Sequence, residues 1–146
     1  MTAEARTRAL DAVELFYRSI NARQFDRLND CLSADWIDHG PSGDHEVRHF
    51  VDSVIEVIGA LPDFSITVED RTDAADRVFL RLRLTGTHRR RFLGVEATGR
   101  PIDIRSHDIH RLDDGRIAES WQLEDWFAAF EQIGGPDTLL PRNGGS

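Results

Sequence analysis

The residues best placed for chemistry share one face of a predicted strand over residues 102–112. Alternate side chains of a strand point to the same side of the sheet, so Ser106, Asp108 and His110 lie between apolar positions on one face. A carboxyl group buried on such a face is costly unless it is hydrogen-bonded, paired or protonated. Asp108 is therefore either a functional acid or base in a pocket, or a structural residue that pairs with His110 or forms a hydrogen bond to the sheet.

The turn after this strand decides which residues lie opposite Asp108. The sequence Asp-Asp-Gly at residues 113–115 leads into a second predicted strand over residues 116–123. A two-residue turn sets Asp108 opposite Trp121, whereas a three-residue loop with a left-handed glycine sets it opposite Ser120. We favour the three-residue loop, because its last position requires positive φ and so suits glycine.

Asp38 and His39 form a second polar cluster, at the end of a predicted short strand and directly before a glycine. Asp and Gly are ordinary turn residues, so a turn explains this cluster as well as a functional site does. Asp108 and His110 share a face and could hold a metal ion with His39 as a third ligand. No spacing in the chain matches a metal-binding motif, so we expect no metal and no cofactor.

Composition limits the class of protein. The chain has 146 residues and a net charge of −8, which indicates one domain and argues against nucleic-acid binding. The basic run at residues 88–91 is short and is expected to be a solvated loop. Cys31 is the only cysteine, which excludes an intramolecular disulfide. We see neither a secretion leader nor an apolar run of roughly 18 residues, so we expect a cytoplasmic protein without membrane contact.

The periodicity of the apolar residues predicts helices first and strands afterwards. Asp125 is expected to cap the last helix, and Glu124 is expected to be exposed. This order indicates an α+β domain over residues 1–135, with a curved sheet, helices on one face and a loosely ordered tail at residues 136–146. The predicted helices cover residues 3–21, 25–32, 44–58 and 126–133, and the predicted strands cover residues 36–39, 64–68, 78–85, 102–112 and 116–123.

Several motifs in this order resemble the SnoaL-like polyketide cyclase, or ester cyclase, family. That family belongs to the nuclear-transport-factor-like superfamily, which also includes ketosteroid isomerase and limonene epoxide hydrolase. The resemblance covers roughly residues 10–134. The motifs are Asp-His-Gly at 38–40, Thr-Gly-Thr-His at 85–88, Phe-Leu-Gly-Val at 92–95, Thr-Gly-Arg at 98–100, and Asp-Gly-Arg-Ile at 114–117 followed by Glu119 and Trp121.

The resemblance implies a cone-shaped barrel, in which a curved, mostly antiparallel sheet wraps around N-terminal helices and encloses one deep pocket. It also implies a homodimer through the outer face of the sheet. Arg81, Arg83 and Trp121 are the expected participants in that contact.

The catalytic residues of the family carry over only in part. The family's pocket acid/base falls on Gln122, which cannot transfer a proton, while its pocket histidine falls on Asp108 and a neighbouring glutamine on Ser106. In ketosteroid isomerase the oxyanion-hole aspartate also falls on Asp108, and the base falls near Asp38. The oxyanion-hole tyrosine falls on about Phe16, with Tyr17 beside it.

We therefore expect a cofactor-independent cyclase or isomerase that acts on a hydrophobic, polyketide-like small molecule. The alternatives are epoxide opening in the same pocket and a non-catalytic domain that binds a ligand or assists another protein. Epoxide hydrolysis of this type uses an Asp-Arg-Asp network, and Arg105 is expected to point away from Asp108. The expected catalytic residues are Asp108, His110, Asp38 and His39, and the expected substrate-binding residues are Ser106, Gln122, Ser120, Phe16, Tyr17 and Trp36.

Overall fold

Residues 10–135 are described by the computed structural model, in which six strands form one curved sheet in the order β2-β1-β6-β5-β4-β3. All neighbouring strands are antiparallel except β1 and β6, which are parallel. The α+β class is confirmed, and the sheet is open, with β2 and β3 as its edges. The strands are β1 (Leu32–Gly40), β2 (Gly43–His45), β3 (Ser65–Ala74), β4 (Arg77–Thr87), β5 (Pro101–Asp113) and β6 (Arg116–Glu124).

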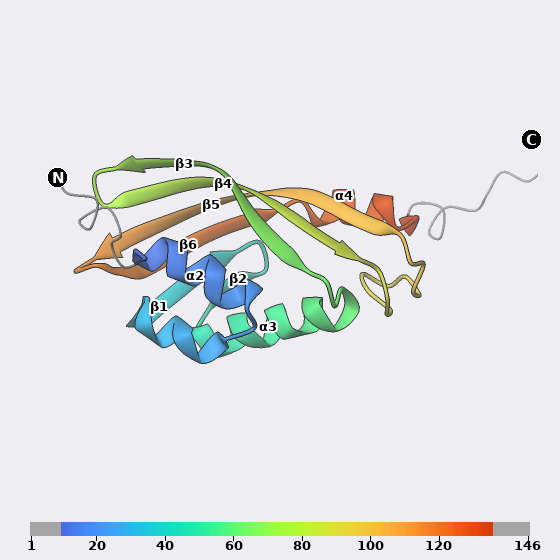
Figure 1. Cartoon of the computed structure of the whole chain (residues 1–146), viewed down its shortest axis with the longest axis horizontal. Helices are drawn as coiled ribbons and strands as arrows, with labels where there is room; N and C mark the ends of the chain where they lie inside the picture. Colours follow the sequence, from blue (N-terminus) through green and yellow to red (C-terminus); the bar gives the residue numbers. More distant parts are fainter. Residues whose placement is uncertain (1–9, 136–146) are drawn as a thin grey trace, which may run out of the picture.

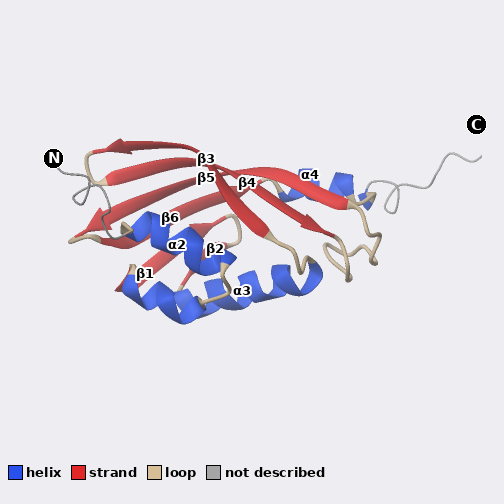
Figure 2. Ribbon diagram, viewed as in Figure 1, coloured by secondary structure: helices blue, strands red, loops and turns tan. Residues whose placement is uncertain are grey.

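Two helices, α2 (Ala12–Asn21) and α3 (Val47–Ala60), lie along the concave face of the sheet, and α4 (Trp126–Gln132) packs against one end of β5 (Figures 1 and 2). A short 3-10 helix, η1 (Phe25–Asp30), joins α2 to β1. None of the described helices is long and apolar enough to cross a membrane.

The core forms because the alternation in β4 turns one apolar face toward α2. Leu80, Leu82 and Leu84 are buried along that strand, and Phe16 and Ile20 of α2 pack into the same cluster. Asp11 caps α2, because its carboxylate accepts a hydrogen bond from the backbone N–H of Glu14 at 2.8 Å. The predicted first helix was expected to begin at residue 3, and residues 3–9 lie outside the described part of the chain.

The start of α3 differs from the prediction. The helix begins at Val47 rather than after an Asp44 cap, because Gly43–His45 pairs with the end of β1 as strand β2. The Asp44 carboxylate instead contacts Nδ1 of His39 at 2.7 Å. Asp125 caps α4 as expected, since its side chain accepts from the N–H of Ala128.

Both predicted registers of the β5–β6 hairpin are wrong. A two-residue turn at Asp114-Gly115, with φ values of 51° and 76°, is followed by a bulge at Ala118. The bulge moves the pairing by one further residue, so Asp108 lies opposite Gln122 and not opposite Ser120 or Trp121. The inward face is nevertheless the one that the three-residue loop predicted.

The basic run at residues 88–91 is only partly a solvated loop. Its three arginines are exposed, but His88 is fully buried. The His88 ring bonds to Thr98 Oγ1 at 2.9 Å and to the carbonyl of Val95 at 3.1 Å, and so fixes the loop that leads into β5.

Gly86 is required where β4 passes the end of α3. A Cβ atom at residue 86 would lie 2.9 Å from Cβ of Leu61, an atom that is fixed to the backbone of a residue only 1% exposed. Gly86→Ala is therefore expected to lower the free energy of unfolding by about 1–3 kcal/mol in urea denaturation. Gly59→Ala is the matched control, because nothing lies within 4 Å of a Cβ at that exposed helical position. We expect that control to be neutral or stabilising by up to ~1 kcal/mol, and equal losses in both variants would contradict the clash.

Candidate active site

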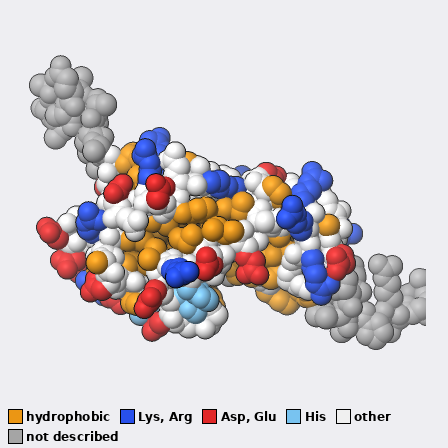
Figure 3. All heavy atoms as spheres, turned by 90° about the horizontal axis from the view of Figure 1, so that it is seen from below, with side chains coloured by type: hydrophobic (Ala, Val, Ile, Leu, Met, Phe, Trp, Pro, Cys, Tyr) orange, Lys and Arg blue, Asp and Glu red, His pale blue; other side chains and the backbone are white. Residues whose placement is uncertain are grey.

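A pocket of about 350 Å³ lies between the concave face of the sheet and α3. Hydrophobic side chains gather on the face of the molecule that carries α2 and α3, with charged side chains around them (Figure 3). Within the pocket, the apolar wall comes from both helices and from β3, β4 and α4. Its side chains are Phe16, Ile20, Phe50, Val54, Val57, Phe64, Ile66, Leu82, Leu84 and Trp126.

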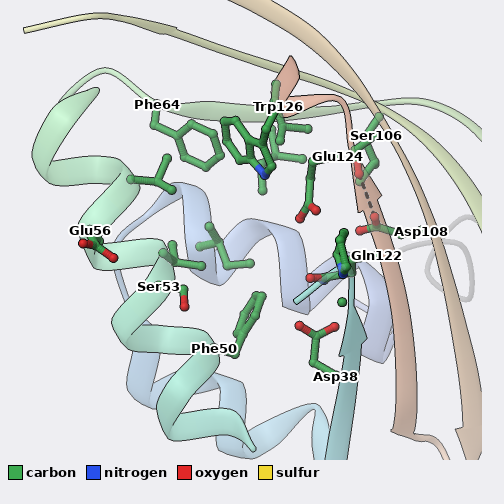
Figure 4. Close-up of a pocket in the computed structure, with 18 of the residues that line it drawn as sticks. Asp38, Phe50, Ser53, Glu56, Phe64, Ser106, Asp108, Gln122, Glu124 and Trp126 are labelled. Atoms are coloured by element: carbon green, nitrogen blue, oxygen red, sulfur yellow. Dashed lines mark hydrogen bonds between the residues drawn. The ribbon is translucent and has the colours of Figure 1, made fainter. Parts of the chain in front are cut away.

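One side of this pocket is polar. Three carboxyl groups reach it from three strands, namely Asp38 from β1, Asp108 from β5 and Glu124 from β6 (Figure 4). The amide of Gln122 lies among them, and Ser106 lies beside Asp108. The arrangement gathers three acids and an amide on the sheet side of a cavity whose wall is mainly apolar.

Asp108 is buried and well supplied with hydrogen-bond donors. The hydroxyl of Tyr17 donates to Oδ2 at 2.6 Å, and the hydroxyl of Ser106 donates to Oδ1 at 2.8 Å. Burial raises the pKa of Asp108 to about 7, against the opposing effect of the Tyr17 hydrogen bond and with a further rise from the nearby Glu124 charge. The carboxyl group can therefore gain or lose a proton near neutral pH.

Asp38 is also buried, but its Oδ1 atom has no hydrogen-bond partner among the described residues. Burial raises the pKa of Asp38 to about 7, and the charge of Glu124 adds to the rise. The residue lies within β1, where it pairs with Ser120, so the turn begins only after it. An unpartnered buried carboxyl oxygen that lines a pocket is available to a ligand.

Glu124 is a pocket residue that the sequence prediction missed. It was expected to be exposed, yet it lines the pocket, and burial raises its pKa. The available signal was parity, because residue 124 continues the inward face of Ser120 and Gln122 along β6.

His110, Ser120 and Trp36 lie behind the pocket and are not among its lining residues. Nε2 of His110 contacts the Tyr17 hydroxyl at 2.7 Å, and Nδ1 contacts Ser120 Oγ at 2.6 Å. The indole N–H of Trp36 donates to the same Ser120 oxygen at 2.9 Å. Burial lowers the pKa of His110 to about 3, so its ring is neutral.

His39 is not brought together with Asp108. It lies on the opposite face of β1 from Asp38, where its ring nitrogens contact Asp44 at 2.7 Å and Glu119 at 2.8 Å. Its ring stacks on Trp121 on the outer side of the sheet. Hydrogen bonds to the two carboxylates raise the pKa of His39.

The remaining predicted residues divide between the pocket and the outer face of the sheet. Phe16, Tyr17, Ser106 and Gln122 line the pocket. Arg105 points outward, as expected, and pairs with Glu69 and Asp103. Within residues 10–135, no group of three or more His, Cys, Asp or Glu side chains is arranged to hold a metal ion.

Solved structures of several other proteins share the fold of this chain. The chain matches IdmH from Streptomyces antibioticus, a candidate polyketide cyclase, with 26% identity, a TM-score of 0.78 and coverage of 84% of this chain and 96% of that one. A candidate polyketide cyclase from Bacillus cereus matches at 25% identity and a TM-score of 0.74, over 85% of this chain and 78% of that one. AclR from Streptomyces galilaeus, a candidate hydroxylase, shares the fold at 22% identity and a TM-score of 0.77, over 97% and 100% of the two chains.

Among curated proteins, a sequence search finds no match. A family model does match, and it spans residues 11–133, which include every strand, α2, α3 and the pocket carboxyls. With an α+β fold, an apolar pocket and a match over nearly all of the described chain, this protein belongs to the SnoaL-like polyketide cyclase family.

Proposed function

We propose that the protein is a cofactor-independent cyclase that acts on a hydrophobic, polyketide-like small molecule, with Asp108 and Asp38 as its base and acid. Membership of the family supports a cyclase- or isomerase-type role. The observation that carries the proposal is the pair of buried carboxyl groups on one side of an apolar pocket, both with a pKa of about 7. Groups that titrate near the working pH transfer protons most efficiently.

The hydrogen bonds support different roles for the two aspartates. Asp108 accepts two hydrogen bonds, and such donors stabilise the ionised form of a carboxyl group. Oδ1 of Asp38 accepts none, and a buried carboxylate oxygen without a donor is disfavoured. Repulsion between two negatively charged carboxylates also opposes the ionisation of both residues. The pair therefore holds one proton at neutral pH, with Asp108 as carboxylate and Asp38 as neutral acid.

This protonation state fits an aldol-type ring closure. The Asp108 carboxylate removes a proton from a carbon next to a carbonyl group, and the C–H electron pair enters the enolate. The enolate carbon attacks a second carbonyl carbon of the same molecule, and the electrons of that C=O bond move to its oxygen. The oxygen takes the proton of Asp38, so one C–C bond forms without oxidation or a leaving group. Transfer of the proton from Asp108 back to Asp38 through water restores the pair.

The pocket supports a neutral, mainly apolar substrate. Its volume of about 350 Å³ falls within the usual range for small-molecule sites, and most of its wall is aliphatic or aromatic. Gln122 cannot transfer a proton, but its amide both donates and accepts hydrogen bonds and so can orient carbonyl and hydroxyl groups. Oriented binding of a flexible substrate supplies much of the rate enhancement for an intramolecular reaction.

The outward position of Arg105 removes support for epoxide opening by an Asp-Arg-Asp network. Arg105 pairs with Glu69 and Asp103 on the far face of the sheet from Asp108. The described residues that line the pocket include no arginine.

Asparagine substitutions distinguish the base from the acid. Asp108→Asn removes the base and is expected to slow proton abstraction by about 10²-fold or more. Asp38→Asn keeps an N–H donor for the developing oxyanion, so we expect a loss of only about 10-fold. The rate is measured by NMR as exchange of the α-protons of β-tetralone, a neutral bicyclic ketone, in heavy water.

Asp103→Asn is the matched control, because Asp103 lies on the same strand as Asp108 but is only half-buried, on the outer face. Its exchange rate should equal that of the unmodified protein. A larger loss in Asp38→Asn than in Asp108→Asn would reverse the two roles, and unmodified protein that leaves the exchange rate at its buffer value would contradict carbon-acid chemistry in this pocket.

The stability of the protein should depend on pH through Asp38. Its pKa is about 7 in the folded chain and close to 4 when unfolded, so the folded state holds a proton that the unfolded state releases. Stability contributed by the neutral carboxyl is present below about pH 4 and is lost as the pH rises through 7. Asp38→Asn cannot ionise, so its stability relative to the unmodified protein is expected to increase by about 1–3 kcal/mol between pH 4 and pH 8.

Urea denaturation at several pH values measures this difference. Asp103 serves as the contrasting control, because its hydrogen bond from Arg83 lowers its pKa to about 2. Asp103→Asn should therefore lose stability relative to the unmodified protein as the pH rises through the acid range. A relative stability of Asp38→Asn that does not change with pH would mean that the pKa of Asp38 is the same in the folded and unfolded chain, and would contradict its raised pKa in the folded protein.

A further inference from the structure

We propose that Trp36 and Ser120 are positioning residues that fix the direction of the hydrogen bonds through His110 and Tyr17 and so keep the Tyr17 hydroxyl donating to Asp108. This inference rests on the proposed function for its catalytic consequence. Its structural content is independent of that function, because it concerns where protons lie in a buried chain of side chains.

The series of hydrogen-bonded side chains, called the hydrogen-bond chain below, runs from β1 through β6 and β5 to α2 and back to β5. Trp36 contacts Ser120 at 2.9 Å, Ser120 contacts His110 at 2.6 Å, His110 contacts Tyr17 at 2.7 Å, and Tyr17 contacts Asp108 at 2.6 Å. All five side chains are buried, with exposed fractions of 4% or less. Each link is therefore made within the protein and away from bulk water.

The two ends of the chain determine the direction of every link between them. Indole N–H is a donor and never an acceptor, so Trp36 must donate to Ser120. Ser120 then gives its own proton to Nδ1 of His110, which is neutral and carries its proton on Nε2. Nε2–H donates to the Tyr17 oxygen, and the Tyr17 proton is left for Asp108.

The opposite direction leaves groups unsatisfied at both ends. If Tyr17 donated to His110, Nδ1–H would donate to Ser120, which already accepts from Trp36. The Ser120 proton would then have no acceptor among the described residues, and Asp108 would lose its Tyr17 donor. An unsatisfied buried polar group costs about 1–3 kcal/mol, so the direction toward Asp108 is strongly preferred.

The chain orients protons and does not conduct them. Trp36 cannot accept a proton, and His110 remains neutral because burial lowers its pKa to about 3. Protons therefore reach Asp108 from the pocket and not from Trp36. The consequence for catalysis is that Tyr17 stabilises the carboxylate form of Asp108 without competing for the substrate proton.

Other charged groups also act on this region and must be held constant in a test. Glu124 of β6 and Asp38 of β1 raise the pKa of Asp108, while Arg71 of β3 acts on Tyr17 and His110. Glu56 and His49 of α3 line the opposite wall of the pocket. None of these residues is altered in the variants below.

The tautomer of His110 tests the inference without any substrate. Long-range ¹H–¹⁵N NMR of the labelled protein distinguishes Nε2–H from Nδ1–H, and the signal is assigned by its loss in His110→Gln. Between about pH 6 and pH 8 we expect neutral His110 with its proton on Nε2. An Nδ1–H tautomer or a charged ring in the unmodified protein would overturn the proposal.

Trp36→Phe tests the role of the donor at the head of the chain. Phenylalanine keeps an aromatic ring against Phe16 and Phe50 but has no N–H group. A water molecule in the space of the indole N–H can then accept the Ser120 proton, so Ser120 can accept from His110 and both tautomers of His110 should be populated. A His110 spectrum identical to that of the unmodified protein would show that Trp36 does not set the direction.

Ser120→Ala and Ser19→Ala form a matched pair of buried serine truncations. Ser19 lies on α2 and is 1% exposed, but its Oγ has no hydrogen-bond partner among the described residues. We expect Ser120→Ala to change the His110 tautomer and Ser19→Ala to leave it unchanged. Equal changes in both would indicate general loosening of the core and would contradict a directed chain.

The same variants connect the chain to catalysis. If Tyr17 donates less often to Asp108, the base is protonated over a wider pH range. In Trp36→Phe and Ser120→Ala we expect kcat for ketone exchange to fall about 3- to 10-fold with little change in KM, and its acid limb to move to higher pH. A change of the His110 tautomer without this kinetic effect would refute the positioning role. If the unmodified protein does not exchange the ketone protons faster than buffer does, only the proposed function is refuted.

Discussion

The hydrogen bond between Tyr17 and Asp108 is the interaction on which the site depends. It joins a helix and a strand that lie 91 residues apart in the sequence, at a distance of 2.6 Å. The same hydroxyl also contacts His110, so α2 must cross β5 at the one position that satisfies both polar groups. Apolar packing around Phe16 would tolerate small shifts of the helix, but two buried polar groups that share one hydroxyl would not. The apolar core therefore supplies the stability of this contact, and the polar contact fixes the position of the helix.

The inward position of Asp108 could be predicted because strand alternation is a local property. Parity alone places Ser106, Asp108 and His110 on one face, and that face is buried. The partner of Asp108 could not be predicted, since the register depends on the bulge at Ala118 as well as on the turn. The pairing of β6 with β1 shifts in the same region, between the pairs Leu32–Ile117 and Ile37–Glu119. The register of β6 thus depends on two neighbouring strands as well as on the turn. One of those strands, β1, is 80 residues away in the chain, so the turn residues alone do not determine the register.

Asp38 and His39 show a second limit of local reasoning. Two adjacent residues on a strand must point to opposite faces, but their sequence does not say which one points inward. In the structure, His39 is satisfied by Asp44, Glu119 and the ring of Trp121, all of which lie outside the pocket, and this leaves the inward side to Asp38. Phe16 and Tyr17 present the same question on a helix, and here both residues reach the pocket. The hydroxyl of Tyr17 then decides which of the two contacts the carboxyl group.

In the proposed mechanism, the polar side of the pocket gives two chemically identical residues different tasks. Asp38 and Asp108 have the same intrinsic acidity, and burial raises the pKa of each to about 7. They differ in the number of donors around them, since Asp108 has two and Oδ1 of Asp38 has none. Ionising Asp108 is thus supported by groups already in place, whereas Asp38 must wait for a substrate to supply a partner. A pocket that distributes its donors unequally can hold one acid and one base side by side without a metal ion or a charged partner to separate them.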